Sequence, residues 1–277
     1  EGGIAATAFG MGINGLRPVV EIQFADYIFP AYDQIVNEMA KVRHRSGGEF
    51  WCPVTIRTPA GGGIRGGHHH SQSPESQFTH TPGLKVVYCS TPYNAKGLLI
   101  SAIEDNDPVI FFEPKRCYRG PFYGDPHNVP TWSDHPEAEV PESHYKIPLG
   151  DARLAIEGDG CTVISWGAMV HVCEQAIKDS GVSCDLIDLQ TLVPWDVETV
   201  VKSVTKTGRC VIVHEAPKTS GFGAEMAASI QERCFWNLES PIERVTGWDT
   251  PFPHTTEWDY MPGPDRVIEA IVRTQEN

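Results

Sequence analysis

The chain has 277 residues, a formal net charge of -14 and a hydrophobic share of 40%. The acidic excess argues against a nucleic-acid surface, because phosphate backbones are bound by clustered Lys and Arg side chains. No apolar run reaches the ~18 residues that a membrane span needs, so we expect a water-soluble protein that is long enough for two domains.

The first half of the chain alternates between helical and extended patterns. A Gly/Ala-rich run is expected to form a helix that approaches a neighbour closely, and Asn94 is expected to cap a later helix. A Gly-rich loop, GGGIRGGHHH, follows the second strand. The expected helices are 2–15, 25–45 and 94–105, and the expected strands are 18–24, 53–59, 84–90 and 108–114.

The second half alternates more regularly. Continuous apolar strands separated by helices of ten or more residues predict parallel βαβ units. Residues 118–143 are rich in Pro, His, Asp and Gly without periodicity, which favours a domain boundary there. The sequence therefore predicts an α/β protein with two three-layer parallel-sheet domains, 1–120 and 149–277, joined by a linker at 121–148.

Candidate chemistry lies after the first strands, because open α/β sheets bind ligands at the carboxyl ends of their strands. Adjacent residues on an extended segment face opposite ways, so of the three consecutive histidines only His68 and His70 could converge. This geometry disfavours a metal site and favours one functional histidine beside a cofactor. His214 and Glu215 are expected to face apart, with a structural or interface role.

Six segments carry a family resemblance. They resemble the β subunit of the decarboxylating dehydrogenase of branched-chain 2-oxo acid complexes, in the transketolase-like thiamine-diphosphate superfamily. Pyruvate-specific β subunits usually read HSQC and lack EIQFADY, so the branched-chain type is favoured. The segments are EIQFADY, HSQSPE, FEPKRCY, DLQTLVPWD, HEAPKTSGFGAE and TGWDTPFPH.

The resemblance implies a pyrimidine-binding first domain, which here lacks its N-terminal start, and a second domain of transketolase C-terminal type. It implies thiamine diphosphate shared with an α subunit that holds the diphosphate and Mg²⁺, in an α2β2 heterotetramer. It also implies a small branched-chain 2-oxo acid as substrate and a lipoylated dihydrolipoyl acyltransferase core as partner.

The resemblance also implies roles for individual residues. Glu1 matches the carboxylate that bonds to a pyrimidine nitrogen and activates the cofactor, Tyr27 matches an aromatic residue that contacts the pyrimidine, and His70 matches an active-site histidine near the thiazolium. A structural K⁺ ion is implied, bound mainly by main-chain carbonyls. The matching positions are Cys52, Val54, Thr55, Ala102, Asp105 and Asp107.

Two alternatives remain open from the sequence. One is a pyruvate or acetoin dehydrogenase β subunit, and the other is a non-catalytic assembly subunit that docks the acyltransferase core. The eight cysteines form no CxxC pair, which favours a reducing compartment. The segment 120–143 resembles the bacterial form of the subunit, so the bacterial cytoplasm is expected, with the mitochondrial matrix as the alternative.

Overall fold

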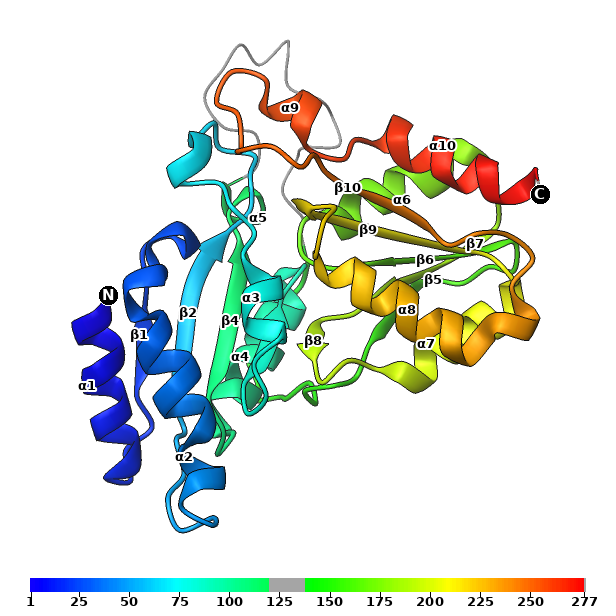
Figure 1. The fold of residues 1–277 in the computed structure, drawn as a ribbon. Helices are drawn as coiled ribbons and strands as arrows, with labels where there is room; N and C mark the ends of the chain where they lie inside the picture. The colour runs from blue at the N-terminus through cyan, green and yellow to red at the C-terminus, as the bar shows by residue number, and fades with distance from the viewer. Residues whose placement is uncertain (120–137, 277) are drawn as a thin grey trace.

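The structure of the chain is a computed structural model that describes residues 1–119 and 138–276. Two α/β halves pack side by side, and each contains a five-stranded sheet (Figure 1). The predicted fold class is confirmed. The part of the predicted linker up to residue 137 lies outside the described residues, and the domain limits remain predictions.

The first sheet has the strand order β1-β2-β4-β3-β8. Its first four strands are parallel, and β8 adds an antiparallel edge by pairing Val193 with Val86 of β3. The sequence does not predict this edge strand, because three residues are too few for a periodic signal. The bounds are β1 Val19–Glu21, β2 Thr55–Ala60, β3 Lys85–Tyr88, β4 Val109–Pro114 and β8 Thr191–Val193.

The second sheet has the order β10-β9-β6-β7-β5. Four strands are parallel, and β5 is again an antiparallel edge, paired with β7. Each sheet thus has the predicted parallel strands and one antiparallel edge strand that the sequence did not predict. The bounds are β5 Arg153–Ile156, β6 Cys161–Ser165, β7 Cys184–Asp188, β9 Cys210–Pro217 and β10 Glu243–Gly247.

Helices lie on both faces of the second sheet, with α6 and α10 on one face and α7 and α8 on the other (Figure 1). None of the described helices is long and apolar enough to cross a membrane. The α-helices are α1 Gly2–Ile13, α2 Ala40–Arg45, α3 Glu75–Thr79, α4 Pro92–Glu104, α5 Arg116–Arg119, α6 Met169–Ser180, α7 Val197–Thr207, α8 Phe222–Cys234, α9 Glu257–Tyr260 and α10 Pro264–Gln275.

Two helix predictions in the first half are wrong in detail. The helix expected over 25–45 is broken into the 3₁₀ turns η1 (Ala25–Tyr27) and η2 (Phe29–Ala31), the π-helical segment η3 (Gln34–Met39) and α2. Pro30 lacks the N–H that a helix starting at residue 25 would need.

The expected cap of the next helix is also displaced by one turn. Thr91, not Asn94, is the N-cap of α4. The Asn94 N–H donates to Thr91 Oγ1 at 3.2 Å, and the Thr91 N–H donates to Asn94 Oδ1 at 2.8 Å. This reciprocal pair is a capping box, and it places Asn94 at the third helical position.

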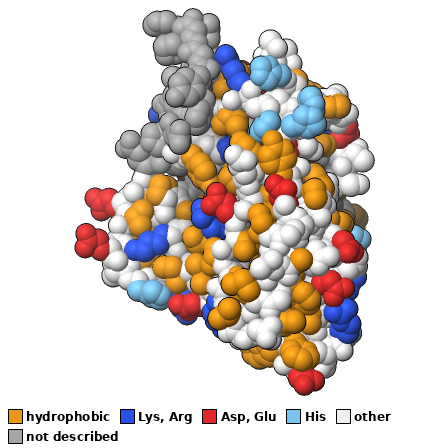
Figure 2. All heavy atoms as spheres, turned by 90° about the vertical axis from the view of Figure 1, so that its left-hand side faces the viewer, with side chains coloured by type: hydrophobic (Ala, Val, Ile, Leu, Met, Phe, Trp, Pro, Cys, Tyr) orange, Lys and Arg blue, Asp and Glu red, His pale blue; other side chains and the backbone are white. Residues whose placement is uncertain are grey.

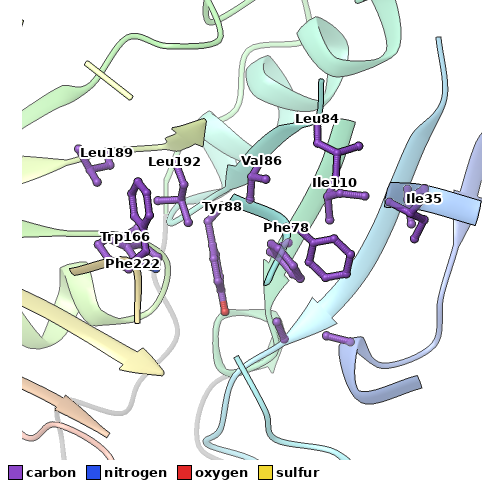
Figure 3. Packing of buried hydrophobic residues seen from close by; sticks show 14 of the residues in the cluster. Ile35, Phe78, Leu84, Val86, Tyr88, Ile110, Trp166, Leu189, Leu192 and Phe222 are labelled. Carbon is purple, nitrogen blue, oxygen red and sulfur yellow. The ribbon is translucent and has the colours of Figure 1, made fainter. Parts of the chain in front are cut away.

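The largest hydrophobic cluster runs through both halves. Figure 3 shows Phe78 and Tyr88 of the first half in the same cluster as Trp166 and Phe222 of the second. The rings of Trp166 and Phe222 meet edge to face, with centroids 5.9 Å apart. This shared core fixes the carboxyl ends of the first sheet against the second half, which is where the candidate site lies.

Candidate active site

Tyr27 and His70 form the centre of the candidate site. Tyr27 lies in η1, after β1, and His70 follows the 3₁₀ turn η4 (Gly67–His69), after β2. The Tyr27 hydroxyl lies 2.7 Å from His70 Nε2. Both rings meet Phe24 edge to face, with centroid distances of 5.6 Å to Tyr27 and 4.7 Å to His70. The structure therefore brings two of the three predicted active-site residues into direct contact.

The other ring nitrogen determines the tautomer of His70. His70 Nδ1 lies 3.2 Å from the carbonyl oxygen of Gly66. Because a carbonyl can only accept a hydrogen bond, Nδ1 carries the proton of the neutral ring and Nε2 accepts from the Tyr27 hydroxyl. A half-buried imidazole with a fixed tautomer is suited to moving or holding a proton at Nε2.

The histidine run is not extended, contrary to the sequence prediction. His68 and His69 lie in the 3₁₀ turn η4, where their rings pack with centroids 4.0 Å apart. His70 alone of the three turns to Tyr27. Within residues 1–119 and 138–276, no three His, Cys, Asp or Glu side chains form a group that could hold a metal ion.

The glycine loop, defined as residues 61–67, needs glycine for close packing. A Cβ at Gly62 would lie 2.6 Å from the Phe252 ring and 2.8 Å from the Met261 sulfur. Gly63 has φ +92° and would bring a Cβ to 2.9 Å from Arg116. At Gly62 the backbone of this loop therefore lies directly against the second half of the chain, and at Gly63 it lies against Arg116 of the first half, so no side chain would fit at either position.

Two buried carboxylates of the second half accept hydrogen bonds from the main chain of the glycine loop. Gly62 N–H donates to Glu215 Oε2 at 2.8 Å. Gly63 N–H and Arg65 N–H donate to the two oxygens of Glu257 at 2.7 and 2.8 Å. We call Glu215 and Glu257 the carboxylate pair. His214 faces the other way, stacked on Trp166 with ring centroids 5.2 Å apart.

The charges around the site are strongly shielded from water. Burial lowers the pKa of Lys115 to about 8, against the opposing effect of the carboxylates of Asp26, Glu215 and Glu257. Burial also raises the pKa of Glu215. Lys115 Nζ lies 5.4 Å from the centre of the Phe24 ring, which is the ring that both Tyr27 and His70 contact.

Glu1 lies apart from these contacts in the described structure. It is exposed and precedes α1, whose first turn packs on η2 through Gly2 and Pro30. Its side chain makes no capping hydrogen bond with α1. No described contact joins Glu1 to Tyr27 or His70, so the convergence of all three residues on one cleft remains a prediction.

The positions predicted to bind K⁺ come from two segments that lie side by side. Thr55 Oγ1 donates to the Ala102 carbonyl at 3.1 Å, and the Val109 N–H donates to the Val54 carbonyl at 2.9 Å. The carbonyl of Cys52 accepts from the Val54 N–H at 2.8 Å. The start of β2 and the end of α4 therefore meet as a K⁺ site would require.

The two aspartates of this group are engaged through their side chains. Lys85 Nζ lies 2.6 Å from Asp105 Oδ2 and 3.5 Å from Asp107 Oδ2. Arg17 Nη1 donates to the main-chain carbonyl of Asp105 at 2.8 Å. The carbonyls of Cys52, Val54 and Asp105 each accept one of these hydrogen bonds and keep a second lone pair for a hard cation, whereas the Ala102 carbonyl also accepts from the Asp105 N–H at 3.3 Å.

Glu75 gives the site region a distinctive pH response. It is buried, and the Trp166 indole N–H donates to its Oε1 at 3.3 Å. Burial raises its pKa from 4.5 to about 8. The pKa of Glu75 is higher in the folded than in the unfolded protein, so protonated Glu75 stabilises the folded state fully below pH 4.5. This contribution to the free energy of unfolding falls as the pH rises above 4.5 and is lost once the pH has passed through 8.

We therefore expect wild type to lose about 2 kcal/mol more unfolding free energy than Glu75→Gln between about pH 6 and 8.5. Glutamine has the shape of the protonated carboxyl and does not titrate. Urea unfolding followed by tryptophan fluorescence at both pH values measures the difference. Equal losses in the two proteins would contradict the assignment.

Family comparisons agree with this geometry. Residues 1–121 match the transketolase pyrimidine binding domain, and residues 150–267 match the transketolase C-terminal domain. The 2-oxoisovalerate dehydrogenase subunit beta of Pseudomonas aeruginosa is 56% identical over 278 residues, covering 100% of this chain and 79% of the relative. The chain belongs to the 2-oxoisovalerate dehydrogenase β subunit family.

A eukaryotic β subunit of the same name and a pyruvate dehydrogenase β subunit also resemble this chain. The mitochondrial 2-oxoisovalerate dehydrogenase subunit beta of Dictyostelium discoideum is also 56% identical, over 99% of this chain and 71% of the relative. The pyruvate dehydrogenase E1 component subunit beta of Acholeplasma laidlawii is 43% identical, over 98% and 80%. The branched-chain reading from HSQSPE and EIQFADY is confirmed, and the pyruvate reading is the weaker alternative.

A solved structure shows the same fold. The split gene transketolase, an inactive beta4 tetramer, has a TM-score of 0.76 with this chain at 18% sequence identity, and the match covers 100% of this chain and 82% of that one. The chain is thus a β subunit of a thiamine-diphosphate-dependent branched-chain 2-oxo acid dehydrogenase with a transketolase-like fold.

Several residues of this β subunit site were not found from sequence. Glu215 had one usable signal, its position at the carboxyl end of a buried strand. Glu257 lies in an aromatic segment without a periodic pattern, which gives no local sign that its side chain binds a distant loop. The contacts of both residues join segments more than 150 positions apart, and no local pattern reports such a contact.

Proposed function

We propose that this chain works only together with an α subunit, and that Glu1, Tyr27 and His70 are its contribution to the shared active site. The Tyr27–His70 hydrogen bond at the carboxyl edge of the first sheet is the observation that supports this most directly. The reaction is the decarboxylation of branched-chain 2-oxo acids with reductive acylation of a lipoyl group.

The residues at this edge fit thiamine diphosphate. Phe24 and Tyr27 offer half-buried aromatic surface beside which a flat heteroaromatic ring can pack. When bound, the cofactor supplies the electron sink for loss of CO2. In our proposal Glu1 holds a proton at a pyrimidine nitrogen, Tyr27 contacts the pyrimidine, and His70 holds or moves a proton at Nε2. The diphosphate and its Mg²⁺ are assigned to the α subunit.

An uncovered apolar face supports the α partner. α1 contains no charged residue, yet Ile4 and Met11 are 40% and 38% exposed. Leu16 and Val19, which follow it, are 54% and 43% exposed. Figure 2 faces this side of the molecule and shows apolar side chains spread over it. Apolar surface of this kind marks an interaction site, and we assign it to contacts within an α2β2 heterotetramer.

The acyltransferase partner and the cellular compartment are proposed from the family resemblance. We propose that the assembled enzyme passes its acyl group to a lipoylated dihydrolipoyl acyltransferase core. We propose the bacterial cytoplasm as its location, because residues 120–143 resemble the bacterial form of the subunit. The mitochondrial matrix is the alternative, since a bacterial and a mitochondrial relative are equally similar at 56% identity.

Substrate assays test the proposal. The full-length chain, co-expressed with its α subunit, is expected to decarboxylate 3-methyl-2-oxobutanoate with a kcat/KM at least about tenfold above that for pyruvate, since additional methyl groups in an apolar pocket give about 10- to 200-fold discrimination. CO2 release with each substrate measures the ratio. Activity on pyruvate alone would support a pyruvate dehydrogenase instead, and a correctly assembled complex without any activity would support a non-catalytic assembly subunit.

We also propose that K⁺ binds between the start of β2 and the end of α4, through the main-chain oxygens of Cys52, Val54, Thr55, Ala102, Asp105 and Asp107. Replacing K⁺ by choline at equal ionic strength is then expected to lower the thermal midpoint of the assembled enzyme by about 4 °C, because a ligand of the folded state alone stabilises it. Differential scanning calorimetry measures the shift. Identical midpoints in both salts would contradict the site.

A further inference from the structure

The second half of the chain holds the segment that carries His70 by its main chain. Glu257 accepts from two successive parts of the glycine loop, Gly63 and Arg65, and Glu215 accepts from Gly62. The base of the segment is closed by a hydrogen bond from the Gly61 N–H to the Gln72 carbonyl at 3.0 Å. The segment is therefore fixed at its base and in its middle.

Burial makes these contacts strong. Glu257 is 1% exposed and Glu215 is 7% exposed. A buried carboxylate is costly unless its oxygens accept hydrogen bonds, and bonds from N–H groups to a charged acceptor are about twice as strong as neutral ones. Both oxygens of Glu257 accept from the loop, so the loop and the carboxylate stabilise each other.

The held segment is directly connected to the His70 ring. Gly66, just beyond Arg65, accepts from His70 Nδ1 through its carbonyl. A Cβ at Gly66 would lie 2.7 Å from His70 Cβ, so the two residues are already in close contact. A shift of the loop moves the Gly66 carbonyl, and the carbonyl sets which nitrogen of His70 carries the proton.

We propose that Glu257, supported by Glu215, is a positioning residue for His70: the carboxylate pair fixes the glycine loop, and the loop fixes the orientation and tautomer of the imidazole. This inference rests on the proposed function of His70. It gives the second half of the chain a part in the reaction, although neither carboxylate touches Tyr27 or His70 in the structure.

Hydrogen exchange tests the contact itself. In the assembled enzyme, Glu257→Gln should accelerate amide exchange in the peptide 61–70 by about tenfold or more, because an amide side chain has only one acceptor oxygen. Asp185→Asn is the matched control, since Asp185 is 2% exposed and accepts from the Gly158 N–H at 2.9 Å, away from this loop. Unchanged exchange in Glu257→Gln would overturn the proposal.

A double-mutant cycle tests the action through His70. Glu257→Gln should lower the kcat of reductive acylation by about tenfold with the KM nearly unchanged. It should have no further effect in a His70→Ala background. Glu215→Gln keeps one acceptor oxygen for the Gly62 N–H but removes the negative charge that strengthens this single bond, so it should behave alike with about a threefold loss, and it serves if Glu257→Gln fails to assemble. Losses of the same size with and without His70 would overturn the positioning role. Full activity of His70→Ala would refute the proposed role of His70 and with it the positioning role, while faster exchange would still establish the contact.

Discussion

Replacement of Glu1 by glutamine in the full-length chain, co-expressed with its α subunit, is expected to reduce decarboxylation by about a hundred- to ten-thousandfold. That range is the usual contribution of a positioned proton-transfer group. Glutamine keeps the shape of the side chain but cannot share a proton with a ring nitrogen. The initial rate of CO2 release at saturating substrate, measured on the purified complex, gives the loss.

The position of Glu1 at a helix start is compatible with the proposed role. The Glu1 carbonyl accepts from the Ala5 N–H at 3.0 Å, so Glu1 stands at the start of α1. The aligned peptide dipoles of the helix place a partial positive charge there, which favours a negative side chain. The Glu1 side chain makes no capping bond and therefore remains available for a ligand.

Assembly and charge need separate controls in this experiment. Glu157→Gln makes the same change at an exposed position in the second half, and it should leave the rate within about twofold, since surface substitutions away from special features have small effects. Light scattering should give the same mass for all three complexes. Full activity of Glu1→Gln in an intact tetramer would remove Glu1 from the mechanism.

The fold was predictable wherever burial gave a continuous apolar strand. Val163, Leu186 and Val211 are fully buried, and their strands are among the continuous apolar strands that the sequence of the second half predicted. The short strands β5 and β8 were missed because each lies at a sheet edge, where few residues and mixed burial leave no clear period. α10 was missed as well, although Val267, Ala270 and Ile271 face the core at helical spacing.

The site was predictable only in part. The Gly-rich loop and the hypothesis of one functional histidine in it followed from composition, because glycine permits close approach of the backbone. The partnership of His70 with Tyr27 joins residues 43 positions apart and came only through family resemblance. The carboxylate pair could not be foreseen, since it depends on how the two halves of the chain pack together.

The Tyr27–His70 pair yields the second large expected effect. His70→Ala should lower reductive acylation of a lipoylated acceptor domain by about a hundredfold, as expected for the loss of a group that moves a proton. Tyr27→Phe should lower it by about tenfold, because the imidazole remains but Nε2 loses the hydroxyl that bonds to it. Two steady-state assays separate acyl transfer from decarboxylation. One measures acylation of the lipoyl domain, and the other measures CO2 release when an artificial oxidant replaces the lipoyl domain as electron acceptor.

The two residues should act as one unit. Gly66 holds the proton on Nδ1, and Tyr27 donates to Nε2. Without the imidazole ring the Tyr27 hydroxyl has no Nε2 to bond to, so the double variant should be no less active than His70→Ala alone. Tyr32→Phe is the matched control, because its hydroxyl donates to the Gln77 carbonyl at 3.2 Å and not to His70. Independent, multiplying losses would instead mean that Tyr27 acts on the cofactor and not through the imidazole.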